Sequence, residues 1–280
     1  MEASLLESEA LIRLGCFTAV LAAMLGWEFA FPLHPRREPR FFHNGRNLAV
    51  LLLDALVVRL IVPLAPVGLA QIVIARDWGL MNQFQMPVWL AIPLTVVLLD
   101  LAIYGQHVVF HAVPFLWRMH MVHHSDLDFS ATTGVRFHPL EILISACLKL
   151  GLVVLLGPPV LGVMLFEILL NGSSLFNHTN VHLPVSIDRW LRWIIVTPDM
   201  HRVHHSAEKP ETNSNFGFNL PWWDRLFRTY TAQPQAGHED MIIGLEHWRE
   251  KNQLTLGKLL LLPFSGSGGG YSIIGGRGKK

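Results

Sequence analysis

The sequence predicts an all-α, polytopic membrane helical bundle with a cytoplasmic helical cap that is lined by histidines. Of the 280 residues, 51% are hydrophobic and only 15% are charged, whereas soluble proteins average about 25% charged residues. The mean hydropathy is +0.37. Several apolar stretches reach the ~20 residues that a membrane-spanning helix requires. The histidines between and after these stretches recur at the spacing of one helix face.

Residues 1–106 are expected to form the N-terminal transmembrane spans. The first apolar stretch follows acidic residues and has no basic segment before it, so we interpret it as a retained span and not as a cleaved signal peptide. Pro63 and Pro66 are expected to kink or end the second span, because proline interrupts helical hydrogen bonding. The three apolar stretches occupy residues 11–33, 47–74 and 86–106.

The loop between the first two predicted spans is rich in arginine. Positively charged loops are retained on the cytoplasmic side of a membrane. We therefore expect this loop to be cytoplasmic and the N-terminus to lie outside. The arginines are Arg36, Arg37, Arg40 and Arg46.

The remainder of the chain divides into four predicted segments. Counting the spans places all histidine motifs on the same, cytoplasmic membrane face. Residues 184–196 contain two tryptophans and two arginines, a composition that fits an interfacial amphipathic helix or an ordinary surface helix. The segments are 107–139 with the first two histidine motifs, the membrane hairpin 140–182 with arms 140–156 and 159–177, the cap 183–258 with the third motif, and a flexible tail 259–280 that is rich in glycine and serine.

The most informative feature is a set of ten histidines that resembles the ligand set of a two-metal site. Fifteen histidines occur in the chain, and eleven of them lie between His107 and His205. Neutral imidazole binds transition metals, and residues three or four apart share a helix face. Each histidine trio can therefore offer neighbouring rings to two different ions, and the two pairs can complete each ion. The set is His107, His111, His120, His123, His124, His178, His182, His201, His204 and His205.

Several other polar residues are candidates to orient these rings or to move protons. Asp100, Tyr104 and the first histidine pair lie on one stripe of the third span, where Asp100 either orients an imidazole or bonds Tyr104. His138 precedes a proline in a predicted loop, which favours a supporting role over that of an eleventh ligand. The full set of candidates is Asp100, Tyr104, His138, Glu141, Asp199 and Asp224.

Two stretches of the sequence resemble the fatty acid hydroxylase and sterol desaturase superfamily. The first runs from Leu116 to Ser125 and is followed by Thr132-Thr133 and by residues 136–141. The second runs from Thr197 to His205 and is followed by residues 215–217 and 223–227. The resemblance covers roughly residues 100–230, and it assigns ligand roles to the ten histidines named above.

This resemblance implies an integral membrane enzyme with two iron ions that uses O2 and two electrons to hydroxylate or desaturate a lipid. Oxidation of an unactivated C–H bond does require a redox metal, because no side chain supplies such an oxidant. Zinc is expected as a substitute in purified protein, since the affinity order does not favour ferrous iron. A structural zinc site is disfavoured, because such sites use four ligands and usually cysteine.

The sequence lacks the motifs of several other functional classes. There is no basic stripe for nucleic acid, no dinucleotide loop, and no haem segment or cysteine cluster. We therefore expect a separate cytoplasmic electron donor, a ferredoxin or a cytochrome. A membrane metal transporter is the first alternative, but it would place histidines near the bilayer midplane. A metal-stabilised membrane protein without catalytic activity is the second.

Overall fold

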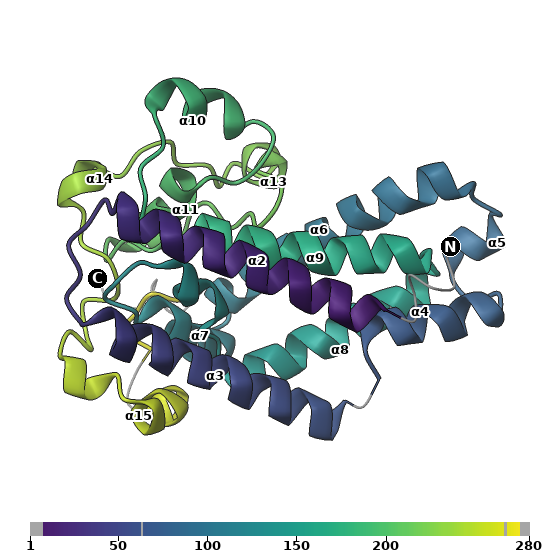
Figure 1. Ribbon diagram of the computed structural model, residues 1–280, viewed down its shortest axis with the longest axis horizontal. Helices are drawn as coiled ribbons and strands as arrows, with labels where there is room; N and C mark the ends of the chain where they lie inside the picture. Colours follow the sequence, from purple (N-terminus) through teal and green to yellow (C-terminus); the bar gives the residue numbers. More distant parts are fainter. Residues whose placement is uncertain (1–7, 63, 266–267, 275–280) are drawn as a thin grey trace.

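The computed structural model describes residues 8–62, 64–265 and 268–274, and this part of the chain is helical apart from its loops (Figure 1). It contains no named β-strand, only an isolated bridge between Ser206 and Ile243. The α-helices are α2 (Glu9–Ala30), α3 (Arg40–Ile61), α4 (Pro66–Ala75), α5 (Leu80–Gln83), α6 (Val88–Ala112), α7 (Pro114–His124), α8 (Pro139–Leu156), α9 (Val160–Asn177), α10 (Val185–Leu191), α11 (Pro198–His204), α12 (Lys209–Thr212), α13 (Trp222–Leu226), α14 (Gly237–Asp240) and α15 (Leu256–Leu261), with 3-10 turns η1 (Ala131–Val135), η2 (Lys251–Gln253) and η3 (Leu262–Phe264).

The long helices form an elongated bundle that fits a multi-pass integral membrane protein. Helix α9 packs against α2 and α6, and α8 packs against α3 and α4. Within the described residues, five helical segments are long and apolar enough to cross a membrane. They are Glu9–Ala30, Arg40–Gln83, Val88–Ala112, Pro139–Leu156 and Val160–Asn177. The predicted all-α membrane fold is confirmed.

The second apolar stretch is divided into two helices. Helix α3 ends at Ile61, and α4 begins at Pro66 with that proline in its first turn. Pro63 itself lies outside the described residues. The predicted interruption of this span is therefore confirmed, because proline cannot continue the hydrogen bonding of the preceding turn.

Helices α8 and α9 form a hairpin close to the predicted one. Gly157 ends α8 in the left-handed conformation with φ +62°, which glycine adopts without steric cost. A Cβ atom added there would lie 2.3 Å from the carbonyl oxygen of Trp78. The tight turn and the close approach of the 78–79 backbone both explain why a glycine occupies this position.

One end of the bundle gathers the segments that carry the histidines. The C-terminal end of α2, the N-terminal end of α3 and helices α7 and α11 lie toward the left of Figure 1, where α10 and α13–α15 surround them. The arginine loop between α2 and α3 is at this same end. The segments that carry the histidine motifs thus lie at one end of the bundle, as the sequence predicts.

The predicted flexible tail from residue 259 onward is wrong for its described part. Helix α15 and η3 cover 256–264, and Gly268 O accepts a hydrogen bond of 2.7 Å from the indole nitrogen of Trp117. Tyr271 is 1% exposed, and its hydroxyl donates to Ala207 O at 2.8 Å. A prediction from glycine and serine content alone overlooks the buried side chain of Tyr271. Residues 266–267 and 275–280 lie outside the described part.

Candidate metal centre

Nine buried histidines form two adjacent groups whose candidate ligand atoms lie within 4.8 Å of one another. We call the first the cavity-side group and the second the inner group. The cavity-side group comprises His107, His111, His120, His124 and His204. The inner group comprises His123, His178, His201 and His205.

Helical spacing explains how each histidine trio is shared between the two groups. On α7, His120 and His124 are four residues apart and share a face, whereas His123 is turned to the inner group. At α11 the assignment is reversed, because His204 joins the cavity-side group while His201 and His205 join the inner group. The groups are also in ring contact, since His124 stacks on His205 at 4.5 Å between centroids. Each of the two neighbouring groups has the spacing that could hold a metal ion.

Four rings of the cavity-side group are held by a partner on the nitrogen that faces away from the group. The Nδ1 atom of His107 lies 2.8 Å from Phe216 O, and that of His120 lies 2.7 Å from a Glu141 carboxylate oxygen. His111 and His204 bond in the same way to Asn213 Oδ1 at 3.1 Å and Ser214 O at 2.6 Å. Such bonds fix the tautomer that leaves the Nε2 lone pair free for a metal ion.

The inner group fits a bound cation better than it fits hydrogen bonding. The Nδ1 atom of His178 lies 2.6 Å from Ser174 O, which makes its Nε2 an acceptor. That Nε2 lies 3.0–3.1 Å from the Nε2 atoms of His123, His201 and His205. One lone pair cannot accept three such bonds. Two nitrogens about 2.1 Å from one ion at right angles are about 3.0 Å apart, close to these spacings.

Burial keeps the described ligand rings neutral. Desolvation lowers the pKa of His120 and of His178 to about 3. Burial, reinforced by neighbouring rings, also lowers the pKa of the other histidines of α7 and α11. The Nε2 atoms of His111, His124 and His204 are buried and have no hydrogen-bond partner within the described residues. Neutral imidazoles with free lone pairs are the donor set that a transition metal requires.

His182 does not join either group, although the sequence predicts it as a ligand. Helix α9 ends at Asn177, so the four-residue spacing from His178 to His182 is not helical and does not place both rings on one face. Its Nδ1 instead lies 3.0 Å from Asp199, and its side chain is 43% exposed. The structure therefore brings together nine of the ten predicted histidines.

Of the predicted orienting residues, Glu141 contacts a histidine of the two groups. Asp199 pairs with His182 and with Arg202, the latter at 2.5 Å. His138 caps α8, because its Nδ1 accepts from Leu140 N at 3.2 Å, and its Nε2 lies 3.2 Å from Leu260 O. These two residues support the surrounding chain.

Asp100, Tyr104 and Asp224 position the loop that follows α12. Asp100 accepts from the side chains of Asn219 and Trp223, both at 2.8 Å, and so it bonds neither an imidazole nor Tyr104. The Tyr104 hydroxyl pairs with Thr229 Oγ1 at 2.9 Å. The Asp224 carboxylate accepts from the amides of residues 216 and 217, and burial raises its pKa to about 6. This loop carries the Phe216 carbonyl that holds His107.

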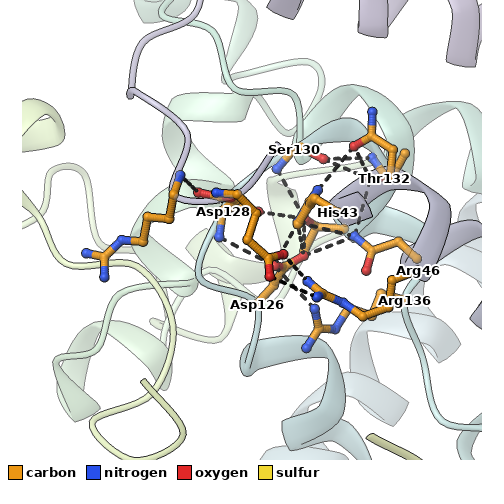
Figure 2. A network of polar contacts seen from close by, with 12 residues as sticks. His43, Arg46, Asp126, Asp128, Ser130, Thr132 and Arg136 are labelled. Atoms are coloured by element: carbon orange, nitrogen blue, oxygen red, sulfur yellow. Dashed lines mark hydrogen bonds and ion pairs between the residues drawn. The ribbon is translucent and has the colours of Figure 1, made fainter. Parts of the chain in front are cut away.

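A polar network between α3 and the chain that follows α7, shown in Figure 2, was not predicted from the sequence. Asp126 lies 2.8 Å from His43 Nε2 and 3.2 Å from the guanidinium of Arg136, and it accepts from Asn47 at 3.1 Å. Burial opposes ionisation of Asp126, but His43 and Arg136 outweigh it and hold its pKa well below the usual range. The network ties the chain after His124 to α3. The acidic residue two positions after His124 was the available signal.

A cavity of about 470 Å³ adjoins the cavity-side group. His107 and His120 line one end of it together with Glu141 and Phe137. Helices α3, α6, α8 and α9 supply its walls, so the cavity runs inside the membrane-spanning bundle. A hydrocarbon chain in this space would be placed next to two candidate ligands.

Comparison with known proteins identifies the family. The fatty acid hydroxylase profile matches residues 92–229. The chain is 31% identical over 157 residues to the ornithine lipid hydroxylase of Rhizobium tropici, with 56% of this chain and 46% of that protein covered. It is 31% identical over 149 residues to the alkylglycerol monooxygenase of Homo sapiens, with 53% and 31% covered. The methylsterol monooxygenase 2-2 of Arabidopsis thaliana is 24% identical over 190 residues, with 66% and 69% covered.

The chain aligns with only part of the length of these relatives. The aligned segment spans less than half of the Rhizobium protein and about a third of the human protein. No solved structure matches the chain. The matched segment nevertheless contains all nine histidines of the two groups, and this part of the chain belongs to the fatty acid hydroxylase family.

Proposed function

We propose that the protein is a membrane-bound non-haem di-iron oxygenase that hydroxylates or desaturates a lipid. The observation that carries the proposal is the pair of buried histidine groups beside a cavity inside the bundle. The relatives named as hydroxylases and monooxygenases of lipids support this reaction class. In hydroxylation, one oxygen atom of O2 enters the lipid as a hydroxyl group, and the other leaves as water after uptake of two electrons and two protons.

In this proposal the histidines bind the ions, and neighbouring side chains orient the histidines and exclude water. The cavity-side histidines would hold one iron and the inner histidines the other, and the bound pair supplies the redox chemistry for reduction of O2. Glu141 orients His120 through a bond of 2.7 Å. Phe137 stacks on His123 at 4.4 Å between centroids and lines the cavity, which shields the centre from bulk water.

We further propose that the histidine end of the bundle faces the cytoplasm. Two of the four arginines lie between α2 and α3 and two lie in the first two turns of α3, and this segment is at the histidine end. Loops with such positive charge stay in the cytoplasm. A separate ferredoxin or cytochrome would then deliver electrons from that side. A reporter enzyme fused to the C-terminus and active only in the cytoplasm should be active, and an inactive but stably inserted fusion would contradict this orientation.

Lipid analysis of expressing cells tests the reaction itself. Aerobic cells with the wild-type chain should accumulate an oxidised lipid that is missing from cells with a His123→Ala/His204→Ala variant, which removes one ligand from each group. Purified wild-type protein from iron-replete medium should contain about two metal ions per chain. Identical lipid profiles with two bound metals would instead favour a metal-stabilised protein without catalytic activity.

A further inference from the structure

The two ends of the cavity differ in exposure. His107, His120 and Glu141 at the histidine end are all buried, whereas Arg59 and Leu64 are exposed. Lining residues on α3 extend from Leu51 to Val62, which corresponds to about 16 Å of helix. The cavity is thus closed at the histidines and accessible at the end near the break between α3 and α4.

Cationic side chains line the accessible half. Lys149, Arg13 and Arg59 all contribute to the wall. Glu167 is 5% exposed and accepts from Lys149 Nζ at 2.7 Å and from Arg13 at 3.3 Å. Arg59 makes no ion pair with another described residue. Ionisable side chains within membrane spans that face an interior cavity commonly mark a substrate site.

The deeper wall contains polar atoms that lack partners. Asp54 is 3% exposed, and its Oδ1 has no hydrogen-bond partner among the described residues. Gln106 Oε1 and Glu141 Oε2 are also buried without a partner, and all three residues line the cavity. A buried polar group without a hydrogen-bond partner destabilises the folded protein. A guest that is only hydrocarbon therefore fits this wall poorly.

We infer that the substrate is a lipid with an anionic oxygen headgroup, a carboxylate or a phosphate, that binds at Arg59 and Lys149 while its chain extends to His107 and His120. Asp54 also lines the cavity, and its unpaired oxygen can accept a hydrogen bond from a hydroxyl or an amide N–H in the part of the lipid that links headgroup and chain. This inference rests on the proposed oxygenase function and specifies its substrate class.

The same geometry determines which part of the lipid is oxidised. Lys149 follows Glu141 by eight residues on α8, which is about 12 Å along the helix axis. Because Glu141 contacts His120, a headgroup at Lys149 keeps the first carbons of the chain away from the metal centre. Oxidation is therefore expected on the distal part of the chain and not beside the headgroup.

Binding measurements on the full-length, metal-loaded protein in lipid nanodiscs test the headgroup site. The probes are a long-chain fatty acid, a lysophosphatidic acid with the same chain, and the matching fatty alcohol, each competing against a spin-labelled fatty acid. Arg59→Gln is the main variant, because removal of a cation without an ion pair leaves no buried carboxylate unpaired. Arg76→Gln is the matched control, since Arg76 follows α4 and does not line the cavity.

We expect the wild-type protein to bind at least one acidic probe more tightly than the alcohol. Arg59→Gln should raise the Kd of that acidic probe roughly fivefold, as for a partly exposed charge pair, and leave the Kd of the alcohol unchanged. The stronger of the two acidic probes identifies carboxylate or phosphate as the recognised group. A Lys149→Met variant, in which Glu167 keeps its ion pair with Arg13, should also weaken acid binding and not alcohol binding.

Equal binding of the acidic probes and the alcohol would overturn the inference, as would equal effects of Arg59→Gln and Arg76→Gln. Products hydroxylated beside the headgroup would overturn the predicted direction of the chain. These failures differ from a failure of the proposed function. An oxidised lipid without headgroup preference contradicts only the inference, whereas headgroup-dependent binding without any lipid oxidation contradicts only the oxygenase proposal.

Discussion

The two histidine groups are held in place in different ways. In the cavity-side group, four of five rings bond through Nδ1 to Glu141, to Asn213 or to backbone carbonyls. In the inner group only His178 has such a partner, and the Nδ1 atoms of His123, His201 and His205 have none within the described residues. The inner rings are positioned mainly by packing against one another and against aromatic neighbours such as Phe137 and Phe129.

This difference indicates a division of roles between the two proposed iron sites. A metal whose ligands are oriented by hydrogen bonds keeps a defined geometry during the reaction. The cavity-side group has this support, and two of its members line the cavity. The inner group contributes no residue to the cavity wall. We therefore expect the cavity-side iron to lie next to the lipid and the inner iron to be the more easily lost.

Removal of a single ligand from either group is expected to have the largest effect on lipid oxidation. His124→Ala and His123→Ala change neighbouring residues of α7 that belong to opposite groups. Both should lower lipid oxidation by more than about a hundredfold, because even residues that only orient a ligand contribute 10–100-fold. Each variant should retain about one metal ion per chain, and Mössbauer spectra of the two iron-loaded variants should differ.

His182→Ala is the control for these ligand variants, because His182 is half exposed and lies outside both groups. It should keep two metal ions and most of the activity. Loss of a metal ion from His182→Ala, or identical Mössbauer spectra for the two α7 variants, would contradict the assignment of nine ligands to two groups.

Loss of the Glu141 carboxylate should have the next largest effect. Glu141→Leu removes the acceptor that lies 2.7 Å from His120 Nδ1, and activity or affinity of the cavity-side metal should fall about 10–100-fold. Glu141→Gln keeps an acceptor oxygen, so it should recover part of this loss. Metal content and turnover of the three proteins give the measurement. Preferential loss of the inner metal in Glu141→Leu would reverse the comparison.

Chelation should separate the two groups by rate. We expect the inner metal to leave about ten times faster than the cavity-side metal, since three of the four inner rings lack an orienting partner. Metal released against time under a chelator should then show two phases. The first phase should be unchanged in Glu141→Gln and the second accelerated. A single phase in the wild-type protein would argue against different support for the two sites.

The sequence predicts that each histidine trio can offer rings to two different ions, because helical spacing separates the rings. Once His120, His123 and His124 lie on one helix, their angular separation decides which rings can share an ion. The all-α class and the interruption at Pro66 likewise follow from hydropathy and proline chemistry. These features depend on neighbours within a few residues along the chain, and local sequence contains that information.

Contacts between distant segments were harder to predict. His182 has the right spacing from His178, but α9 ends at Asn177. The partner of His111 is Asn213, about a hundred residues away. Asp100 lies on the predicted polar stripe, yet its partners come from residues 219–223. Pairings of this kind depend on tertiary packing and not on spacing.

The smallest effect is expected from the C-terminal segment, which supports only the cavity-side group. Tyr271 stacks on Trp117 at 5.7 Å between centroids, and the Trp117 ring lies 4.8 Å from His111 and 5.3 Å from His124. Tyr271→Phe keeps the stacking and removes two hydrogen bonds of the hydroxyl, which donates to Ala207 O and accepts from Glu246 N.

We expect Tyr271→Phe to lower the free energy of unfolding by about 1–2 kcal/mol, because two hydrogen bonds are lost and each contributes a net ~1 kcal/mol. Metal content should stay at two ions, while the slow phase of chelation should become slightly faster and the fast phase should not change. Thermal unfolding in detergent and the chelation time course measure the two effects. An accelerated fast phase would mean that the segment supports the inner group as well, and the two groups would then be less independent than their hydrogen bonds indicate.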